Sequence, residues 1–575
     1  MTYTAPVAEQ RFVLETIADL PGLAQLPAFE AAPPDLVEAI LTEAGKLASG
    51  VFAPLNRIGD TQGADVRDGV VTLPAGFREA YQQYVEGGWG SVGADPNWGG
   101  QGLPFVLASA VQEQLTSANM AFSLCMMLTQ GAIDALTAHA SDEQKAIYLT
   151  KLISGEWTGT MNLTEPQAGS DVGALRTRAE EAGDGTYRIK GQKIYITWGE
   201  HDVADNIVHL VLARLPDAPA GTKGISLFIV PKILPDGKRN DLRCVSVEHK
   251  LGIHASPTCT MSFGDNDACV GWMVGPENAG MRAMFTMMNH ARINVGLQGV
   301  AIAERAYQGA LAYAKERVQT RRIIEHPDVR RMLMTLKATT EAIRALTYLN
   351  AAAVDRAHAT GDREAQALAD LLTPVTKGYG TDMGVELSSL AVQVFGGMGF
   401  VEETGAAQHL RDARIAPIYE GTNGIQALDL VNRKLPQGRW KTLFADIRAD
   451  IRLLGKDGDL GAMAPYLDDG LAALENATVW LLGNQGDAAA DAAAGATPYL
   501  RMFGIVTGGW LLAKQALAAQ ARLAAGEGDP AFLEAKITTA RFFAEQVVPQ
   551  GTALLGPVTR GAGLLYALSE EQFAA

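Results

Sequence analysis

Hydrophobic and polar positions follow three successive patterns along this 575-residue chain. From residue 35, apolar side chains recur every three or four positions, beginning with Leu36, Ile40 and Leu41, which is the period of a helix face. Short β-prone runs separated by turn residues follow between about 158 and 275, and the helical period returns from Gly280. The order helices, strands, helices predicts an α+β protein and disfavours an alternating βαβ sheet.

The same pattern predicts individual elements. Strands are expected at 187–190, 193–197, 207–213, 225–230 and 244–247, and short strands at this spacing are typical of a small barrel or sandwich. Ser141, followed by two acidic residues, is a typical helix start. Further helices are expected at 281–319 and, beyond the break at 436–438, at 443–454, 467–482, 498–525 and 532–547.

These elements predict five consecutive regions of the chain. They are an N-terminal extension (1–34), an N-terminal α-helical domain (35–157), a β-barrel domain (158–276), an α-helical bundle (277–435) and an additional C-terminal helical extension (436–575). No fixed-period internal repeat is found in the sequence.

Composition narrows the class of protein. Hydrophobic residues make up 47% and charged residues 19%, so a large packed core is expected. The 48 basic and 64 acidic side chains give a net charge of −16, which disfavours nucleic acid as a partner. The sequence begins without the basic and apolar stretches of a signal peptide, and it contains no uninterrupted apolar run of 18 residues. We therefore expect a cytoplasmic protein that neither enters a membrane nor binds nucleic acid.

Generic motifs exclude several chemistries. Gly88, Gly90 and Gly93 match GxGxxG, but they follow a helix-like run and lead into Asp95-Pro96, whereas a phosphate-binding turn needs a strand before it and a helix after it. GxxxxGK[ST], HExxH and GxSxG are absent from the sequence. The cysteines are too scattered for a disulfide framework or a zinc site, at Cys125, Cys244, Cys259 and Cys269.

Three other segments carry candidate chemistry. Residues 161–171 combine small hydroxyls, a proline and a glycine, so their backbone could approach a planar ligand, although composition alone favours a capped turn. Residues 393–400 form a glycine-rich turn after a helix, for which a helix C-cap is the alternative. Glu420 lies between Pro-Ile-Tyr and Gly-Thr, where a carboxylate could be partly desolvated, and a solvated loop glutamate is the alternative there.

Taken together, in this order and spacing, the three segments resemble those of the acyl-CoA dehydrogenases. The resemblance covers roughly residues 35–435 and includes 99–102, 193–199 and Glu316-Arg317. It implies a flavoprotein with an α-domain, a β-barrel and a second α-domain. The N-terminal segment and the long C-terminal helical region resemble those of the branch that acts on 3-methylmercaptopropionyl-CoA.

The resemblance also implies a reaction. An acyl-CoA thioester would lose its α-proton to Glu420 and its β-hydride to N5 of FAD, giving a trans-2-enoyl-CoA. A desolvated carboxylate suits this task, because burial raises its pKa and makes it a stronger base. Some relatives carry the glutamate just before the position of Arg292; Ala291 occupies that position here, which leaves Glu420 as the candidate. Its N–H and a ribityl hydroxyl would stabilise the charge on the thioester oxygen.

Residue roles follow from the same resemblance. The FAD-binding residues it implies are Met161, Leu163, Thr164, Gly169, Ser170, Tyr195, Thr197, Arg317, Gln393, Gly396, Gly397, Thr422 and Asn423. The substrate-binding residues are Ser170, Arg292, Tyr419 and Gly421, with no metal. A surface ion pair is the alternative role for Arg292. After Arg317 the sequence departs from the family, since Val-Gln-Thr-Arg replaces an aromatic residue and a glycine.

Expected partners complete this interpretation. The resemblance implies an acyl-CoA substrate, an electron-transfer flavoprotein as electron acceptor, and a homodimer, with a tetramer as the alternative. Two other functions stay open at this point. An acyl-CoA oxidase would share the fold and the glutamate but reduce oxygen, and a non-catalytic relative would bind DNA through its C-terminal region. The net charge of −16 argues against DNA binding.

Overall fold

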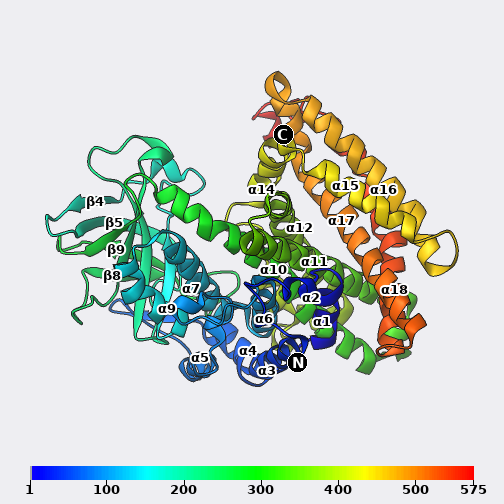
Figure 1. Cartoon of the computed structure of the whole chain (residues 1–575), viewed down its shortest axis with the longest axis horizontal. Coiled ribbons are helices and arrows are strands. Elements are labelled where there is room, and N and C mark those ends of the chain that lie inside the picture. Colours follow the sequence, from blue (N-terminus) through cyan, green and yellow to red (C-terminus); the bar gives the residue numbers. More distant parts are fainter. Residues whose placement is uncertain (1–2) are drawn as a thin grey trace. The chain divides into compact units, whose positions relative to one another are not determined.

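A computed structural model describes residues 3–575, except for the side chains of Met287, Asn289 and Asp487 (Figure 1). The chain divides into two compact units. The sheet unit contains residues 3–5 and 39–291, and the helix unit contains residues 6–38 and 292–575.

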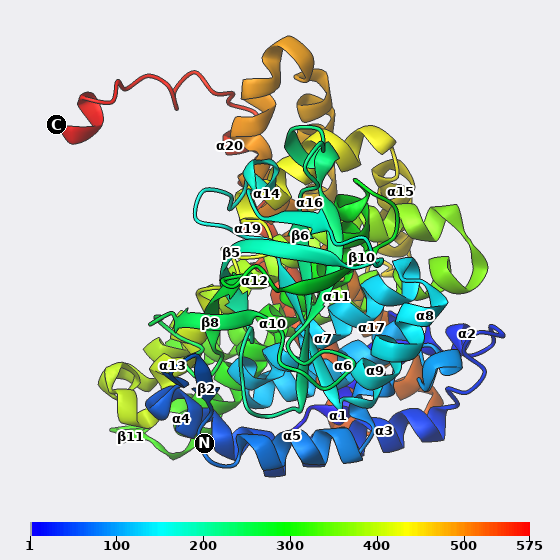
Figure 2. The ribbon, with the colours of Figure 1, turned by 90° about the vertical axis from the view of Figure 1, so that its left-hand side faces the viewer.

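An eight-stranded sheet forms the centre of the sheet unit, and strands β5, β6 and β10 cross the view of Figure 2. The strand order is β3-β6-β7-β10-β5-β9-β8, with β4 paired to β5. β3 and β6 are parallel, and the other pairs are antiparallel. The strands are β3 (Trp157–Asn162), β4 (Arg178–Glu181), β5 (Tyr187–Thr197), β6 (Asn206–Ala213), β7 (Ser226–Pro231), β8 (Leu242–Val247), β9 (Thr258–Phe263) and β10 (Val270–Val274).

Hydrogen bonds between β4 and the end of β6 close part of this sheet into a barrel. The Ala179 N–H donates to the Arg214 carbonyl at 2.8 Å, and the Arg214 N–H donates to the Thr177 carbonyl at 2.9 Å. Strands β6, β7, β10, β5 and β4 thereby form a ring. Every residue of β6 is buried, consistent with a sequence that is apolar except at Asn206 and His209.

Helices cover the sheet within the same unit. α7 packs against β3, and nearly all of its side chains are buried, consistent with a sequence that is apolar on every face. The Asn119 side chain caps α7 by accepting a hydrogen bond from the Phe122 N–H at 3.1 Å. A small hairpin is formed by β1 (Asp65–Arg67) and β2 (Val70–Thr72). The helices are α4 (Ala53–Gln62), α5 (Phe77–Glu86), α6 (Phe105–Ala118), α7 (Met120–His139), α8 (Asp142–Gln144) and α9 (Thr150–Ser154).

Long helices form the helix unit. α10 (Gly280–Glu316) enters it at Arg292 and is followed by α11 (Pro327–Thr360) and α12 (Arg363–Phe395). Between α10 and α11 lies a short hairpin of β11 (Val318–Gln319) and β12 (Arg321–Arg322). The remaining helices of this part are α1 (Val7–Thr16), α2 (Leu20–Leu23), α13 (Ala406–Ala413) and α14 (Asn423–Asp429), and α3 (Pro34–Leu47) begins here.

Glycines bring α10 and α12 unusually close. A Cβ placed on Gly299 would lie 2.0 Å from the Gly380 carbonyl oxygen, and one on Gly296 would lie 2.6 Å from the Thr376 carbonyl oxygen. A Cβ on Gly384 would lie 2.8 Å from the Gly299 Cα. The two backbones therefore touch along this stretch, where no side chain could be accommodated.

Four further long helices belong to the C-terminal region, drawn in yellow to red in Figure 1. They are α15 (Trp440–Leu453), α16 (Gly458–Gly483), α17 (Ala489–Ala525) and α18 (Pro530–Gln546), followed by the short α19 (Val548–Thr552) and α20 (Leu555–Val558). α17 packs against α11, α12 and α14 as well as against α16 and α18. The apolar face that the sequence predicts for this region is therefore buried within the helix unit.

A buried ionic network joins four elements of the helix unit, α1, α10, α11 and α18. The Lys536 ammonium of α18 donates to Glu9 of α1 at 2.7 Å and to Glu341 of α11 at 2.6 Å. Lys337 also pairs with Glu341, and Arg344 pairs with Glu304 at 2.7 Å. The Lys536 and Arg344 pairs join segments that are far apart in sequence, whereas Lys337 and Glu341 lie one turn apart on α11.

The α+β fold class is confirmed, and many expected elements occur. Ser141 caps α8 with a complete capping box, and the predicted strands at 207–213, 225–230 and 244–247 correspond to β6, β7 and β8. The two strands expected at 187–190 and 193–197 are one strand, β5. The helix expected at 281–319 is α10, which ends at Glu316 and is followed by the β11–β12 hairpin.

Two helices, α7 and α17, are long and apolar enough to cross a membrane by length and composition. In each, 83% of the apolar window is buried inside the protein, as in the core helices of a globular protein.

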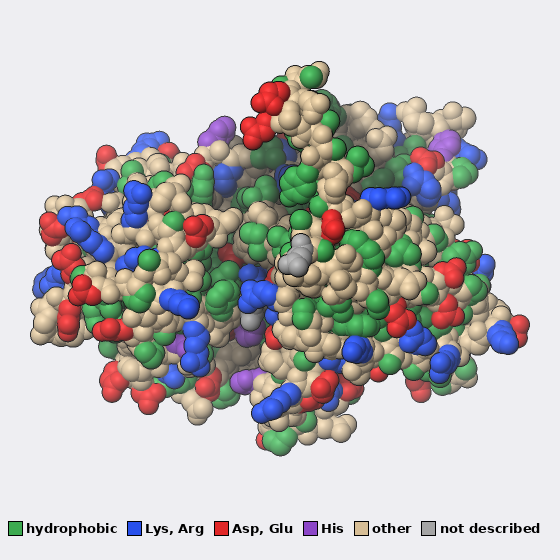
Figure 3. Space-filling view, turned by 90° about the horizontal axis from the view of Figure 1, so that it is seen from above, with side chains coloured by type: hydrophobic (Ala, Val, Ile, Leu, Met, Phe, Trp, Pro, Cys, Tyr) green, Lys and Arg blue, Asp and Glu red, His purple; other side chains and the backbone are tan. Residues whose placement is uncertain are grey.

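On the face shown in Figure 3, Lys and Arg side chains are interspersed with Asp and Glu side chains.

Candidate active site

Glu420 lies in a sharp turn between α13 and α14. Its backbone is left-handed, with φ of 56°, and Gly421 follows with φ of 82°. Glycine adopts this conformation freely, whereas for a glutamate it costs about 1–3 kcal/mol that surrounding contacts must offset. The Thr422 side chain then caps α14 by accepting from the Ile425 N–H at 3.4 Å. The turn therefore combines a strained residue with a fixed helix start.

A buried lysine and two amides hold this turn. The Lys377 ammonium donates to the Gly421 carbonyl at 2.9 Å and to the Asn423 Oδ1 at 2.8 Å. The Asn423 amide donates in turn to Asp382 at 2.7 Å. Gln426 donates to the Gly421 carbonyl at 3.2 Å. These contacts all come from α12 and α14, so the turn is fixed from two helices.

The Glu420 carboxyl is half-buried and faces two cations. Burial raises its pKa from the ordinary value, and the positive charges of Arg292 and Lys377 oppose that rise. Burial also lowers the pKa of Lys377 to about 8, although the Glu420 and Asp382 charges favour its protonated form. A carboxylate with a raised pKa beside fixed positive charges has the properties of a general base.

Arg292 of α10 lies against the same turn. A Cβ on Gly421 would be 3.9 Å from Arg292 Nη2, and Arg292 Nη1 is 4.0 Å from an Asp429 carboxylate oxygen. The guanidinium is largely buried, and its Nε has no hydrogen-bond partner among residues 3–575. Arg292 is thus an inward-facing cation, and its ion pair with Asp429 lies largely away from solvent.

Tyr419 completes this group of residues. Its hydroxyl donates to the Gln298 Oε1 of α10, and burial raises its pKa. The helix unit therefore brings together five of the predicted site residues with Glu420, namely Arg292, Tyr419, Gly421, Thr422 and Asn423.

A second group of predicted residues lies in the sheet unit, where β3 ends. Met161 is the fifth residue of β3 and is buried, while Leu163 and Thr164 follow the strand. The Ile194 N–H donates to the Thr164 carbonyl at 2.9 Å, so this loop lies beside β5. The Lys193 ammonium donates to the Leu163 carbonyl at 3.0 Å. The loop backbone is thus fixed by its neighbouring strand.

The Glu165 carboxylate anchors the rest of this loop. It accepts hydrogen bonds from the Thr177 hydroxyl at 2.6 Å and from Lys193 at 2.8 Å. Although its burial works in the opposite direction, Lys193 and the hydrogen bonds lower the pKa of Glu165 to about 2. Gly169 and Ser170 are exposed in the following turn, and a Cβ on Gly169 would meet no neighbour within 4 Å.

A bulge in β5 turns Tyr195 outward next to this loop. The register with β9 shifts between Lys193 and Ile196, and Tyr195 takes φ of 58° with 60% of its surface exposed. Thr197 is half-buried, and Trp198 (φ of 55°) is buried with its indole N–H donating to the Ala121 carbonyl at 3.2 Å. An exposed aromatic face beside threonine hydroxyls suits a flat ligand with polar edges.

The remaining predicted residues lie in the helix unit, outside the Glu420 group. Arg317 is exposed at the end of α10, where its carbonyl accepts from the Ile323 N–H at 2.8 Å across the β11–β12 hairpin. Gln393, Gly396 and Gly397 are exposed at the end of α12, and Gly396 has φ of 61°. Cβ atoms on both glycines would meet nothing within 4 Å, so this turn leaves open space for a ligand.

Sequence reasoning missed four residues that surround Glu420: Lys377, Asp382, Gln298 and Gln426. Lys377 had a detectable signal, since it is the one basic residue in the segment 371–384, where every other residue except Asp382 is uncharged. The other three gave no such signal, because helix periodicity does not report which polar side chain meets which loop.

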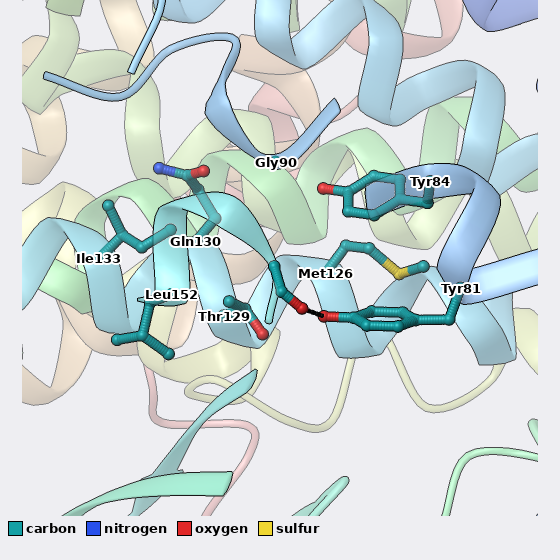
Figure 4. Close-up of a pocket in the computed structure, with 9 residues that line it drawn as sticks. Tyr81, Tyr84, Gly90, Met126, Thr129, Gln130, Ile133 and Leu152 are labelled. Atoms are coloured by element: carbon teal, nitrogen blue, oxygen red, sulfur yellow. Dashed lines mark hydrogen bonds between the residues drawn. The ribbon is translucent and has the colours of Figure 1, made fainter. Parts of the chain in front are cut away.

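A small pocket in the sheet unit lies between α5, α7 and α9 (Figure 4). Tyr84, Met126 and Gln130 point toward it, and the Tyr81 hydroxyl donates to the Gly155 carbonyl at 2.8 Å. None of the predicted site residues lines this pocket. Among the described residues, no group of three or more His, Cys, Asp or Glu side chains could hold a metal ion.

The protein therefore has an N-terminal helical region, a β-sheet region and a C-terminal helical region. Its half-buried Glu420 lies in a sharp turn between two helices. Family models match four consecutive parts of the chain. They are the acyl-CoA dehydrogenase N-terminal domain (residues 63–156), middle domain (160–266) and C-terminal domain (278–435), and the acetyl-CoA dehydrogenase C-terminal-like region (443–569).

Curated relatives match over nearly the whole chain. The 3-methylmercaptopropionyl-CoA dehydrogenase of Ruegeria pomeroyi is 49% identical, covering 96% of this chain and 97% of that protein. A butyryl-CoA dehydrogenase of Syntrophomonas wolfei is 38% identical, covering 90% of each. The chain therefore belongs to the acyl-CoA dehydrogenase family of FAD-dependent enzymes.

Solved structures share the fold. Caenorhabditis elegans ACDH-11, in complex with C11-CoA, superposes with a TM-score of 0.80 at 20% identity, covering 95% of this chain and 92% of that one. Butyryl-CoA dehydrogenase of Megasphaera elsdenii superposes with a TM-score of 0.58 at 27% identity, covering 69% of this chain and 97% of that one. The first of these likenesses also extends over the C-terminal helical region.

Proposed function

We propose that this protein oxidises an acyl-CoA thioester to a trans-2-enoyl-CoA, with Glu420 as the base that removes the α-proton. The observation that carries the proposal is the Glu420 carboxyl itself, which is half-buried, has a raised pKa and lies in a left-handed turn beside Arg292 and Lys377. An α-proton next to a thioester is weakly acidic, so its removal needs a base of raised pKa at a fixed position.

The backbone of Glu420 supports a second role. Among the described residues, its N–H has no hydrogen-bond acceptor, while its carbonyl accepts from Gln426 at 3.4 Å. A free donor attached to the base could stabilise negative charge on the thioester oxygen as the α-proton leaves. We propose that Arg292, Tyr419, Gly421 and Ser170 bind the acyl-CoA.

The residues assigned to FAD fit a flat, polar-edged cofactor. Tyr195 presents an exposed ring beside Thr164 and Thr197, and the glycines 396 and 397 leave an open turn. We propose that these residues bind FAD together with Met161, Leu163, Gly169, Ser170, Arg317, Gln393, Thr422 and Asn423. When bound, FAD supplies a ring that accepts a hydride.

A short or medium acyl-CoA is the proposed substrate, and 3-methylmercaptopropionyl-CoA is the most specific choice, because a dehydrogenase named for that thioester shares 49% of the sequence over almost its whole length. An electron-transfer flavoprotein is the proposed electron acceptor. In support, a solved structure with this fold, at 28% identity and a TM-score of 0.58, is described as the electron transferring flavoprotein of Acidaminococcus fermentans. We also propose a homodimer and a cytoplasmic location.

A panel of acyl-CoA thioesters mixed with the yellow holoenzyme tests this function. Bleaching of the flavin absorbance by 3-methylmercaptopropionyl-CoA, faster than by longer thioesters, is the expected result. Hydrogen peroxide formed at the rate of turnover without an acceptor protein would instead identify an oxidase.

Glu420→Gln tests the base directly. The variant is expected to retain FAD but to bleach about 10³-fold more slowly, since the amide cannot accept the α-proton. Stopped-flow absorbance measures the rate, and Glu527→Gln, an exposed carboxyl on the loop after α17, is the matched control. Bleaching of Glu420→Gln at the wild-type rate would reject Glu420 as the base.

A further inference from the structure

Lys377 is a buried cation attached directly to the turn that carries Glu420. Its side chain leaves α12 and reaches the Gly421 carbonyl and the Asn423 side chain, one and three residues beyond the glutamate. We propose that Lys377 is a positioning residue for Glu420, which fixes the left-handed turn and supplies a positive charge that keeps the carboxylate ionised. The inference rests on the proposed role of Glu420 as the base.

The turn needs such an anchor. Two consecutive residues with positive φ, at 420 and 421, are strained at the glutamate and persist only where neighbouring contacts determine them. Lys377 and Gln426 both donate to the Gly421 carbonyl, at 2.9 and 3.2 Å. Together they fix the peptide that follows Glu420, and hence the direction in which its side chain points.

The contacts of Lys377 are unusual for a buried lysine. Its ammonium donates to two neutral oxygens, and among the described residues it forms no ion pair with a carboxylate. By contrast, the buried Lys536 contacts Glu9 and Glu341 directly. Burying a charge without a carboxylate contact costs free energy of folding. A functional role for the Lys377 charge would explain why a lysine occupies this position.

Electrostatics supplies that reason. Glu420 is the largest source of the attraction that keeps Lys377 protonated, and Lys377 in turn opposes the rise in the pKa of Glu420 that burial causes. The second cation, Arg292, shares its charge with Asp429. Lys377 therefore provides positive charge that no contacting carboxylate neutralises.

Other charged groups face this site from each neighbouring helix. They are Arg292 on α10, Asp382 and Glu386 on α12, Asp429 and Arg433 after the turn, Arg501 on α17, and the Tyr419 hydroxyl beside Glu420. Arg501 pairs with Glu386, and Arg433 pairs with Asp429 at 3.3 Å. These pairs stay intact when Lys377 alone is replaced, so a change in the titration of Glu420 would report on Lys377.

Three substitutions separate charge from hydrogen bonding. Lys377→Arg keeps both, Lys377→Gln keeps a donor without the charge, and Lys377→Met keeps neither. The rate of flavin bleaching by a saturating acyl-CoA is measured for each holoenzyme between pH 5 and 9. For Lys377→Gln and Lys377→Met we expect the acidic limb to move upward by about one pH unit, which is about a tenfold loss of rate on that limb.

The same substitutions are expected to differ at pH 9. There, above the acidic limb, Lys377→Gln should bleach within about threefold of wild type, because it keeps a hydrogen-bond donor for the Gly421 carbonyl. Lys377→Met should be slower still, because the Gly421 carbonyl loses its donor. Lys377→Arg should keep the wild-type acidic limb.

Lys536→Met is the matched control, because Lys536 is as deeply buried in the same unit but lies in the network with Glu9. It should lower the Tm and leave the acidic limb in place. A wild-type acidic limb in both Lys377→Gln and Lys377→Met would overturn the inference. Unimpaired bleaching by Glu420→Gln would instead overturn the proposed function, so the two failures are distinguishable.

Discussion

Several non-glycine residues of the candidate site have left-handed backbone conformations. Glu420 and Tyr195 have φ of 56° and 58°, and Trp198, next to Thr197, has φ of 55°. Each lies in an irregular segment: a helix–helix turn for Glu420 and the bulged end of β5 for the other two. The same conformation also occurs away from the site, for example at Asp68 and Asp267, so it is the burial and the neighbouring polar groups at Glu420, and the exposed ring at Tyr195, that point to a functional role.

The same conformation occurs where the sequence departs from its family. Thr320 has φ of 65° at the tip of the β11–β12 hairpin. A threonine therefore occupies a left-handed position that glycine would adopt at a lower cost. The hairpin still holds the Arg317 carbonyl, which accepts from Ile323.

Two buried histidines in the sheet unit make stability depend on pH. His201 and His209 bond to the hydroxyls of Thr158 and Thr160 at 2.8 and 2.7 Å. Burial, together with nearby cations, lowers the pKa of each histidine to about 3. Below about pH 6.5 these histidines bind protons in the unfolded chain but stay neutral in the folded protein. The free energy of unfolding therefore decreases as the pH falls.

His209→Gln is expected to remove part of this pH dependence. Between pH 7.5 and 5.0 each neutral histidine accounts for a loss of about 2 kcal/mol in the free energy of unfolding. The variant should lose about 2 kcal/mol less than wild type over that interval, as measured by urea titration at both pH values. His326→Gln, at the start of α11, serves as control and should show the wild-type loss. An identical loss in His209→Gln would contradict the assignment.

At the level of elements, the close approach of α10 and α12 positions the candidate base. Arg292 and Gln298 come from α10 and Lys377 from α12, and all three reach the turn at 419–423. Gly296, Gly299, Gly380 and Gly384 allow this approach, because a Cβ on any of them would lie 3.0 Å or less from backbone atoms of the facing helix.

Gly299→Ala is therefore expected to be strongly destabilising. Its Cβ would lie 2.0 Å from the Gly380 carbonyl oxygen, so the helices must separate, at a cost of about 2–3 kcal/mol by analogy with overpacked cores. Urea unfolding measures the change. Gly483→Ala, at the end of α16 with open space around its Cβ, is the control and should change the free energy of unfolding by less than about 1 kcal/mol. Equal effects of the two substitutions would be the contrary result.

Elements with strong periodicity could be predicted from the sequence, while contacts between elements could not. β6 and β7 were predictable from runs that are almost entirely apolar. β5 was expected as two strands, yet it continues through Gly191, where a Cβ would lie 2.4 Å from the Thr177 hydroxyl. The glycine serves close packing against a segment fourteen residues away, which no local pattern reports.

The candidate site was predictable only through family resemblance. Glu420 alone has the sequence surroundings of a solvated loop glutamate, and its burial comes from α10 and α12, more than 40 residues earlier. Lys377 was overlooked because its partners lie in the turn at 421–423. Contacts between distant segments do not produce a periodic pattern in the sequence, so residues positioned by such contacts cannot be recognised from it.

At the scale of the whole chain, the first helix and the last long helix belong to one packed unit. Phe12 of α1 is buried against Phe532 of α18, with ring centroids 5.5 Å apart, and the ammonium of Lys536 lies over the Phe12 ring. Glu9 accepts from that same lysine. The N-terminal extension therefore completes the core of the helix unit.

Removal of residues 1–18 is expected to destabilise the helix unit. The truncation uncovers Phe532 and leaves Lys536 and Glu341 without Glu9, so we expect a loss of about 3 kcal/mol or more, since burial of Phe12 and its buried ionic neighbour are lost together. Thermal unfolding followed by circular dichroism measures the change in Tm. Arg11→Ala, which removes only exposed pairs, is the control and should leave the Tm within about 2 °C. An unchanged Tm on truncation would count against this role.

The glycine contacts between α10 and α12 have a consequence for protein engineering. Because each backbone rests directly on the other, neither helix can be grafted singly from a homologue that carries bulkier residues at the facing positions. Chimeras designed to alter thioester preference would have to exchange α10 and α12 together. A chimera joined within α11 would take the two helices from different parents, so that junction should be avoided.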